Sequence, residues 1–215
     1  MDAEVFRAWI TSAARVIEAN RDHLTQLDAA IGDADHGINL DRGFAAVVGA
    51  LRALDPAAAA PTTPGRILLL TGNTIIAKVG GAAGPLYGMA FRRAGKSLAD
   101  AADVDLPALS AALDAALAGV QQLGAAVEGD KTMVDALAAA TRAFSKAIAE
   151  GASTDDALSA LAAAASAAAI ATIPMQARKG RASYLGPRSV GHEDPGAAST
   201  ALILGALRDA AQAGQ

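Results

Sequence analysis

The first long patterned stretch of the chain runs from Asp2 to Leu27 and reads DAEVFRAWITSAARVIEANRDHLTQL. Its large apolar residues recur every three or four positions, the spacing that places side chains on one face of an α-helix. They are Val5, Trp9, Ile10, Ala13, Ile17 and Leu24. The stretch therefore predicts one long amphipathic helix whose apolar face packs against other helices.

The rest of the chain repeats this helical periodicity, and no stretch alternates apolar and polar residues as a half-buried strand does. The sequence is rich in alanine, the residue with the best helix propensity. Further helices are expected at about 39–54, 65–79, 85–100, 106–123, 131–150, 154–173 and 195–213. Short connections favour antiparallel neighbours, so the sequence predicts an all-α bundle of about eight helices, formed as a single domain over residues 1–215.

Local signals set several of the expected helix ends. Asp105 is placed to cap the helix that starts at 106, and Thr154 or Asp155 is placed to cap the helix that follows. The stretch 55–64, with three prolines, is expected to be a loop.

Composition excludes several classes of protein. Hydrophobic residues make up 53% of the 215 residues and charged residues 19%, which argues against a disordered chain. The absence of cysteine excludes disulfides, zinc knuckles, iron–sulfur clusters and a thiol nucleophile. A net charge of −4 and 3% aromatic residues argue against nucleic-acid binding.

No membrane or export signal is expected. The N-terminus has no apolar run of the kind found in signal peptides. The uncharged stretch from Ala157 to Ile173 is mostly alanine and serine, which is too weakly hydrophobic for a membrane span. We therefore expect a cytoplasmic protein that binds neither membrane nor nucleic acid.

Three connections break the helical pattern, at 28–37, 79–84 and 174–196. The last is unusually long for a compact domain, where such loops are usually functional. It contains Arg178, Lys179, Arg181 and Arg188, with Tyr184 and Leu185 as apolar anchors. It is therefore expected to be an anchored lid.

The first of these connections carries an acidic cluster with the spacing D-x4-D-x-D. Asp28, Asp33 and Asp35 repel one another unless a cation neutralises them, and hard carboxylate oxygens suit Mg²⁺, Mn²⁺ or Ca²⁺. A solvated turn with capping aspartates is the alternative. An EF-hand is excluded, because position 12 of such a loop would be Phe44 instead of a bidentate glutamate.

Taken together, these residues suggest a metal–nucleotide site on a helical bundle. Carboxylates hold a metal, the metal holds phosphate, and arginine neutralises charge as a phosphoryl group moves. The glycine cluster at 79–84 lets backbone N–H groups approach phosphate, although a plain turn between helices explains it equally well. Asp194 directly precedes the last helix, and a role as its N-cap explains this aspartate without any ligand.

Four blocks of sequence resemble one family. IGDADHGINLDRGF (31–44), VGGAAGPLYG (79–88), GDKTM (129–133) and TIPMQARKGRASYLGPRSVGHEDPGA (172–197) are similar to the DhaL-type nucleotide-binding subunit of bacterial dihydroxyacetone kinase, most closely its phosphotransferase-system-linked form. The resemblance implies an up-and-down barrel of eight antiparallel helices with the nucleotide site at one end. It also implies bound ADP or ATP and two Mg²⁺ ions.

The resemblance also assigns residues to the site. It implies that Asp28, Asp33 and Asp35 are the metal ligands and that Arg181 is catalytic. The residues implied to bind the nucleotide are His36, Gly37, Ile38, Asn39, Ala82, Ala83, Gly124, Met133, Arg181, Asp194, Pro195 and Gly196. The family often has serine at the position of Ala83, so one hydroxyl contact worth about 1 kcal/mol is lost here.

Finally, the resemblance implies partners. One is a separate kinase subunit that holds dihydroxyacetone, and the other is a phosphohistidine donor protein of the phosphotransferase system. A homodimer stays open, as does the choice between permanently bound ADP and exchanging ATP. Two other functions stay open as well: a kinase subunit for another ketose or polyol such as erythrulose, and a regulatory module that binds a transcription factor according to its nucleotide state.

Overall fold

The structure, a computed structural model, describes residues 1–54 and 62–214, and these ranges are helical without strands. The elements are α1 (Ala3–Ala19), α2 (Arg21–Ile31), α3 (His36–Arg52), α4 (Pro64–Lys78), α5 (Ala83–Leu98), α6 (Leu106–Gly124), α7 (Met133–Ala149), α8 (Thr154–Ala171), the 3-10 helix η1 (Arg181–Ser189) and α9 (Pro195–Ala213). The expected all-α fold is confirmed. No helix in the described ranges is both long and apolar enough to cross a lipid bilayer.

The helix predicted over 2–27 is two helices, because the chain bends at Asn20. The backbone of this residue lies at φ −106° and ψ 9°, outside the helical region. Its side-chain amide donates to the carbonyl of Val16 at 2.8 Å, so it ends α1 by competing for a helical acceptor. With α1 and α2 taken as one prediction, each of the eight expected helices has a counterpart.

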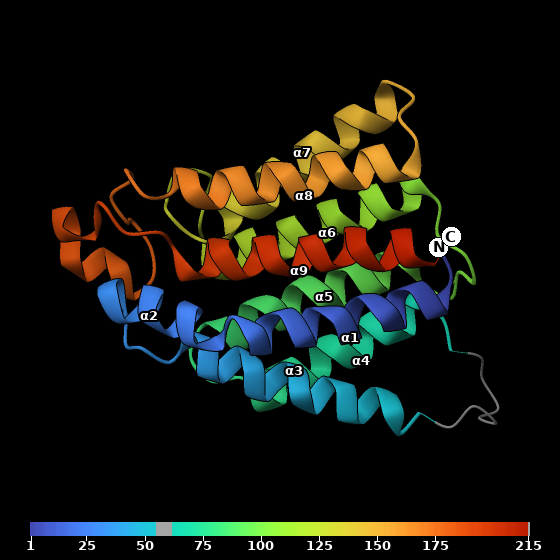
Figure 1. The fold of residues 1–215 in the computed structure, drawn as a ribbon, viewed down its shortest axis with the longest axis horizontal. Coiled ribbons are helices and arrows are strands. Elements are labelled where there is room, and N and C mark those ends of the chain that lie inside the picture. The colour runs from blue at the N-terminus through green and yellow to red at the C-terminus, as the bar shows by residue number, and fades with distance from the viewer. Residues whose placement is uncertain (55–61, 215) are drawn as a thin grey trace.

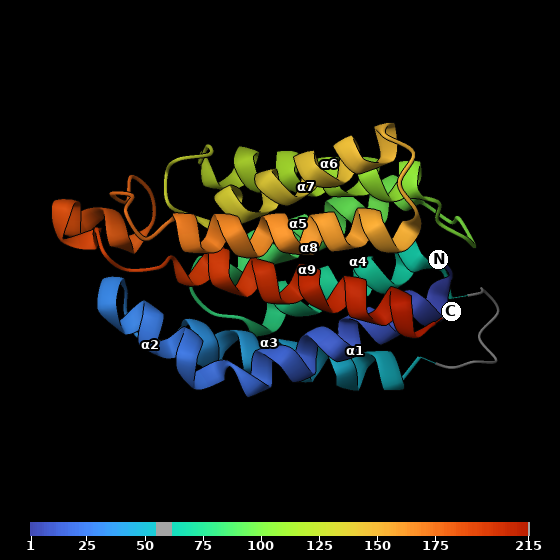
Figure 2. The same ribbon diagram turned by 45° about the horizontal axis from the view of Figure 1, so that its top comes forward.

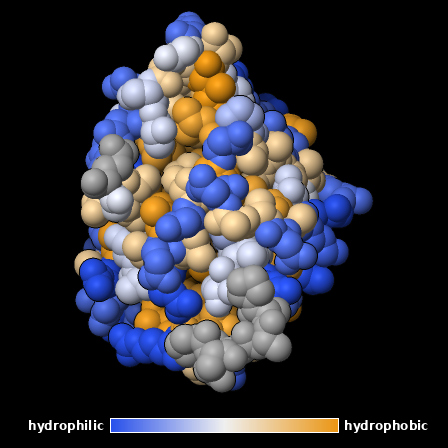
Figure 3. Space-filling model, turned by 90° about the vertical axis from the view of Figure 1, so that its right-hand side faces the viewer, coloured by the Kyte–Doolittle hydropathy of each residue, from blue (hydrophilic) through white to orange (hydrophobic). Residues whose placement is uncertain are grey.

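Consecutive long helices run in opposite directions along the long axis of the molecule (Figures 1 and 2). Up-and-down connectivity places every second connection at the same end. The connections 32–35, 79–82, 125–132 and 172–194 therefore meet at one end, on the left in Figure 1, where α2 and η1 lie. Both termini lie at the opposite end, and Figure 3 shows hydrophilic side chains scattered there among hydrophobic ones.

The bundle interior is a continuous apolar core with an aromatic chain at its centre. The Trp9 ring lies 5.7 Å from Phe6 and 5.9 Å from Phe91, and Phe91 lies 6.3 Å from Phe44, in edge-on or tilted arrangements that aromatic rings favour. The Trp9 indole donates to the carbonyl of Ile203 at 2.9 Å, which satisfies the polar atom inside the core. These contacts tie α1, α3, α5 and α9 together.

Helices α4 and α5 approach so closely that their contact surface requires glycine. A Cβ on Gly72 would lie 2.7 Å from the carbonyl oxygen of Gly88, and a Cβ on Gly88 would overlap the side chain of Ile76. Glycine is otherwise unfavourable inside helices, so its presence at both positions reflects backbone proximity. This close pair fixes where α5 begins, next to the glycine connection 79–82.

The expected caps were partly right. The Asp105 carboxylate accepts from the backbone N–H of Ala108 at 2.8 Å and caps α6 as predicted. The cap of α8 is Ser153, which accepts from the N–H of Asp156 at 3.1 Å, so the assignment to Thr154 or Asp155 was wrong by one or two residues. The loop predicted over 55–64 falls largely on residues 55–61, outside the described ranges.

Candidate functional site

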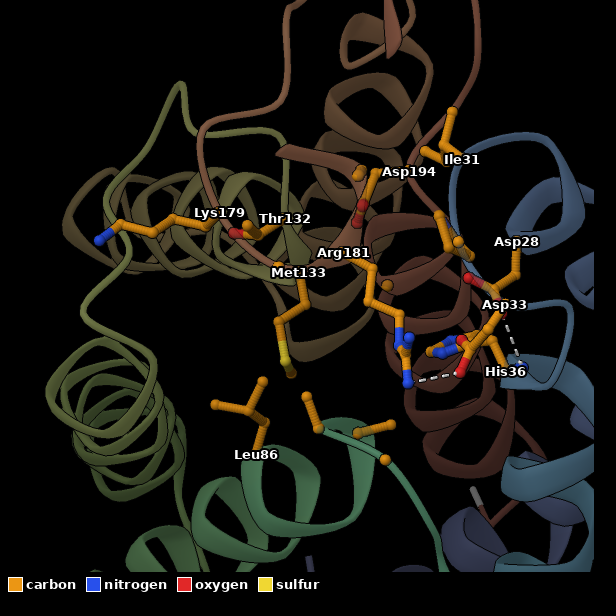
Figure 4. A pocket seen from close by; sticks show the side chains of 18 of the residues that line it. Asp28, Ile31, Asp33, His36, Leu86, Thr132, Met133, Lys179, Arg181 and Asp194 are labelled. Carbon is orange, nitrogen blue, oxygen red and sulfur yellow. Dashed lines mark hydrogen bonds and ion pairs between the residues drawn. The ribbon is translucent and has the colours of Figure 1, made fainter. Parts of the chain in front are cut away.

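The four connections at one end of the bundle surround a hollow of about 820 Å³, counting the open space at its mouth. Its walls come from the end of α2 with the connection 32–35, which together we call the acidic turn, and from the glycine connection 79–82. The loop 125–132, the 172–194 segment and the first turn of α9 complete them (Figure 4). Predicted site residues in its lining are Asp28, Asp33, Asp35, His36, Ala82, Ala83, Met133, Arg181, Asp194, Pro195 and Gly196. Bundle topology thus brings together residues that lie up to 168 positions apart, from Asp28 to Gly196.

The acidic turn is shaped around the side chain of Asp28, which is buried in the last turn of α2. Its Oδ2 accepts from the backbone N–H groups of Asp35 at 2.9 Å and His36 at 3.2 Å, which fixes the start of α3. Gly32 lies so close that a Cβ there would overlap the Asp28 carboxylate. Ala34 takes a left-handed backbone conformation, φ 61°, which costs a non-glycine residue energy and marks a constrained turn.

These constraints bring the three carboxylates together. One oxygen from each of Asp28, Asp33 and Asp35 lies within 4.8 Å of the others. Three hard oxygen donors at this separation fit a divalent cation such as Mg²⁺. The capping alternative holds in part for Asp28, whose Oδ2 caps α3, but it does not explain why Asp33 and Asp35 stand beside it.

A positive side chain already approaches this cluster. The Arg181 guanidinium lies 2.9 Å from Asp33 Oδ2, reaching across the mouth of the hollow as Figure 4 shows. The Arg181 side chain is 68% exposed and that of Asp33 38%, so the pair itself adds little stability. It does show that the geometry at Asp33 accepts a cation, as the carboxylate set suggests.

A buried hydrogen-bond network forms the floor of the hollow. The Nε2 of His36 and the hydroxyl of Ser199 share a hydrogen bond of 2.8 Å, and the Ser199 hydroxyl lies 2.7 Å from that of Tyr87. Burial lowers the pKa of His36, although the carboxylates of Asp28 and Asp35 oppose this. Burial also raises the pKa of Tyr87, so the phenol stays protonated and holds α5 against α9.

The first turn of α9 is closed by its own N-cap. Asp194 caps the helix, with Oδ2 accepting from the N–H of Ala197 at 2.7 Å, so the N-cap reading is confirmed. Burial raises the pKa of Asp194 to about 7, the neighbouring Asp135 adds to the rise, and the N–H of Ala197 and the ammonium of Lys131 oppose it. Pro195 has no N–H and the N–H of Ala197 is taken by Asp194. By contrast, α5 begins at the hollow without a side-chain cap, and free N–H groups at a helix start attract phosphate.

One wall of the hollow is apolar. Met133 at the start of α7 and Leu86 on α5 face each other across it (Figure 4). Ala82 and Ala83 also line the hollow. Four predicted residues lie outside the lining: Gly37, Ile38, Asn39 and Gly124. Ile38 is half-exposed on the outer side of α3, while the Asn39 side chain accepts from Arg42 at 2.7 Å. Gly124 lies behind the wall, with its Cβ position 3.2 Å from Leu86.

The long connection forms a lobe, residues 176–190, that contains η1. Ala177, Ala182 and Leu185 pack on Ile31 of α2. Leu185 is thus an anchor as expected, but Tyr184 is 88% exposed and is not. The 3-10 helix escaped prediction because Gly186, at φ 55°, and Pro187 interrupt any helical period. Of the four basic residues in the lobe, Lys179 and Arg181 line the hollow.

Sequence reasoning missed Lys131 as a site residue. It lines the hollow, yet its side chain is 1% exposed and its backbone lies in the left-handed region at φ 63°. Burial lowers its pKa, and the Asp194 carboxylate opposes this. The GDKTM block was the only signal, since a lysine after glycine and aspartate usually lies on the surface.

Comparison with known proteins finds relatives over most of the chain. The model of the DAK2 domain family matches residues 30–209. The ADP-binding subunit DhaL of the PEP-dependent dihydroxyacetone kinase of Escherichia coli K12 is 41% identical over 204 residues, which are 95% of each chain. The triokinase/FMN cyclase of Bos taurus is 38% identical over 89% of this chain, which spans only 32% of that protein.

A solved structure shows the same fold. The dihydroxyacetone kinase from C. freundii in complex with AMP-PNP and Mg²⁺ superposes with a TM-score of 0.70 at 26% identity, covering 94% of this chain and 33% of that one. The family match, the full-length relative and the shared fold point the same way. The chain belongs to the DAK2 domain family, and within it to the DhaL-type subunits of dihydroxyacetone kinase, which are phosphotransferases.

Proposed function

We propose that this chain binds ADP or ATP together with Mg²⁺ and passes a phosphoryl group to dihydroxyacetone held on a partner subunit. The observation that carries the proposal is the cluster of Asp28, Asp33 and Asp35 inside the hollow, with oxygens within 4.8 Å of one another. The starts of α5 and α9 and the Arg181 side chain line the same hollow. Carboxylates, helix starts and an arginine are the parts that phosphoryl transfer uses.

The acidic turn would hold the metal. Asp35 offers its carboxylate, Asp33 offers one that pairs only with the exposed Arg181, and Asp28 offers the oxygen that does not cap α3. A divalent ion there neutralises phosphate charge when it is bound. Three carboxylates suffice for one ion and leave room for the second that the resemblance implies, because each carboxylate has two oxygens and Asp33 is exposed.

The remaining walls would hold the nucleotide. The apolar surface of Leu86 and Met133 suits a base, and the uncapped N–H groups at the start of α5 suit phosphates. The side chain of Arg181 is long, and it is largely exposed at the mouth of the hollow. Released from Asp33 when a metal binds there, it would neutralise charge on the phosphoryl group in transit.

The first experiment tests the carboxylates. Purified protein should bind ADP with Mg²⁺ in isothermal titration calorimetry, and Asp33→Asn or Asp35→Asn should weaken that binding at least tenfold. Asp209→Asn is a matched control, because Asp209 also pairs with an arginine, Arg208 at 2.6 Å, but lies on α9 near the opposite end. ADP binding that is equal in all four proteins would refute the assignment.

A second experiment addresses the phosphoryl donor and the acceptor. We propose a phosphohistidine protein as donor, since relatives of full length are named PEP- or PTS-dependent. Reconstitution with the dihydroxyacetone-holding subunit should then give turnover with phosphoenolpyruvate and its relay proteins and only catalytic amounts of ADP. Turnover that requires stoichiometric ATP instead would show that the nucleotide exchanges.

Two further measurements use the same sample. Assays with erythrulose in place of dihydroxyacetone compare the two acceptors, and native mass spectrometry reports whether ADP is bound and whether two chains form a dimer.

A further inference from the structure

The lobe that carries Arg181 joins the bundle through a narrow neck, residues 172–175 and 191–194. Two hydrogen bonds close it: the N–H of Gly191 donates to the carbonyl of Ile173 at 2.8 Å, and the N–H of Asp194 donates to Thr172 Oγ1 at 2.9 Å. A shift at this neck would be carried outward to Arg181. The neck therefore helps to set where the guanidinium stands, together with the packing of the lobe on Ile31 of α2.

The ammonium of Lys131 lies at this neck. It donates to the carbonyls of Thr172 at 2.8 Å, Met175 at 3.1 Å and His192 at 2.5 Å, with Ile173 at 3.5 Å as a fourth, weaker neighbour. These carbonyls come from both chain segments of the neck, 172–175 and 191–194. Three of the four, those of Thr172, Ile173 and Met175, follow the C-terminus of α8, where the helix dipole favours a positive charge.

The loop before α7 is shaped to aim this side chain. Lys131 has a left-handed backbone, and its preceding neighbour Asp130 accepts from the N–H of Arg178 in the lobe at 3.0 Å. Lysine is rarely found fully buried without compensating contacts. Among the described lysines and arginines only Lys131 is buried, and the hydrogen bonds that its ammonium donates all go to backbone carbonyls of residues 172–192.

The same geometry separates Lys131 from a phosphate-binding lysine. An ammonium has three N–H donors, and three carbonyls take them. No donor is left to point into the hollow, even though the residue forms part of its wall. Its hydrogen bonds therefore hold the neck and not a ligand.

We propose that Lys131 is a positioning residue. Its buried ammonium acts as a clamp that holds the two chain segments of the neck together, and this keeps the lobe that carries Arg181 over the acidic turn. The part of this inference that concerns the lobe stands on the ligand-free protein. The part that concerns phosphoryl transfer rests on the proposed function.

The first test needs no ligand. Hydrogen–deuterium exchange of Lys131→Met, which keeps length and removes the donors, should accelerate exchange of the 174–193 peptide at least tenfold while α1 and α5 exchange as in wild type. Lys131→Arg should fall between, because its planar donors cannot meet carbonyls from three directions. Lys96→Met, an exposed lysine near the far end of α5, is the control and should match wild type.

Unchanged exchange of 174–193 in Lys131→Met would overturn the proposal. So would acceleration spread evenly over all helices, because that marks a general core residue. Should Lys131→Met fail to fold, Lys131→Arg decides the question, since it retains the buried charge. Faster exchange confined to 174–193 then supports the clamp, and wild-type exchange overturns it.

Binding and turnover separate positioning from phosphate contact. In the reconstituted kinase, Lys131→Met should lower kcat at least tenfold and change the Kd for Mg·ADP less than threefold, with Lys131→Arg recovering part of kcat. A loss of ADP affinity as large as the loss of kcat would show phosphate contact and overturn the assignment. If wild-type protein binds no ADP at all, the proposed function fails, but the exchange result on the lobe still decides the clamp.

Discussion

Asp28 and Asp33 belong to the same cluster but differ in what the fold asks of them. Asp28 is buried and its Oδ2 accepts two backbone N–H groups, whereas Asp33 is exposed and pairs only with Arg181. In metal-free protein, Asp28→Ala should lower the free energy of unfolding by about 1–3 kcal/mol, because it leaves the start of α3 uncapped. Asp33→Ala should change it by less than about 0.5 kcal/mol.

Urea denaturation in EDTA measures both changes. Both variants should nevertheless lose Mg²⁺-dependent ADP binding. Asp33→Ala should therefore lose the ligand while it keeps the stability of the wild type. An Asp33→Ala variant that is as destabilised as Asp28→Ala would mean that the two carboxylates share a structural role.

Asp194 makes a prediction about pH. Its pKa is raised to about 7 in the folded protein by burial, against about 3.9 in an unfolded chain. As pH rises from 4 to 7 the unfolded state loses this proton first, so the contribution of Asp194 to stability is present below about pH 4 and is lost by about pH 7. Asp194→Asn keeps an oxygen for the N–H of Ala197 and removes the titration.

The free energy of unfolding of Asp194→Asn, relative to wild type, should therefore increase by at least about 1 kcal/mol between pH 5 and pH 8. Urea titrations at the two pH values, without metal, measure this difference. Asp135 and Lys131, the charged groups that act on Asp194, are present in both proteins and cancel in it. A difference that is flat or that decreases contradicts the raised pKa.

The candidate residues that sequence alone could indicate are those whose chemistry is local. Asp28, Asp33 and Asp35 lie within eight positions, and Asp194 directly precedes a helix start with proline. Lys131 could not be found this way, because its partners Thr172 and His192 lie 41 and 61 positions away and are backbone carbonyls. Carbonyls carry no signature in the sequence.

At the scale of elements, some helical glycines are required by close helix packing and others are not. Gly88→Ala should lower the free energy of unfolding by about 1–3 kcal/mol, since the new methyl would overlap Ile76 on α4. Gly205→Ala in α9 is the same substitution where nothing lies within 4 Å of the added carbon. It should raise stability by up to about 1 kcal/mol through helix propensity. Changes of equal sign in thermal or urea denaturation would contradict the close α4–α5 contact.

Periodicity located the helices well and one boundary poorly, for a physical reason. Ile17 and Leu24 are seven residues apart and both fully buried, so the apolar pattern continues across the bend at Asn20. The bend depends on the Asn20 side chain taking the Val16 carbonyl, an interaction that leaves the apolar spacing unchanged. The 3-10 helix η1 escaped for a different reason, since Gly186 and Pro187 interrupt it after a few residues.

At the scale of the molecule, up-and-down topology explains why distant motifs form one site. The sequence predicted helices with short connections, and alternation then places the connections 32–35, 79–82, 125–132 and 172–194 at the same end. What the sequence could not supply is the lobe packed on α2 and the neck beneath it. Both depend on contacts between segments far apart in the chain.

A site built from so many elements should stabilise the whole fold when it is filled. Mg·ADP at one hundred times its Kd adds about 2.7 kcal/mol to the free energy of unfolding, which in a domain of this size raises Tm by roughly 5–10 °C. Differential scanning fluorimetry with ADP should show this rise with Mg²⁺ and little of it in EDTA. An equal rise in EDTA would mean that ADP binds without the carboxylates.

The most direct measurement is anomalous diffraction from crystals grown with ADP and Mn²⁺ in place of Mg²⁺. The account predicts a manganese peak bonded to oxygens of Asp28, Asp33 and Asp35, with the nucleotide phosphates on its far side and Arg181 released from Asp33. Manganese elsewhere, with the three carboxylates facing solvent and Arg181 still paired to Asp33, would contradict it.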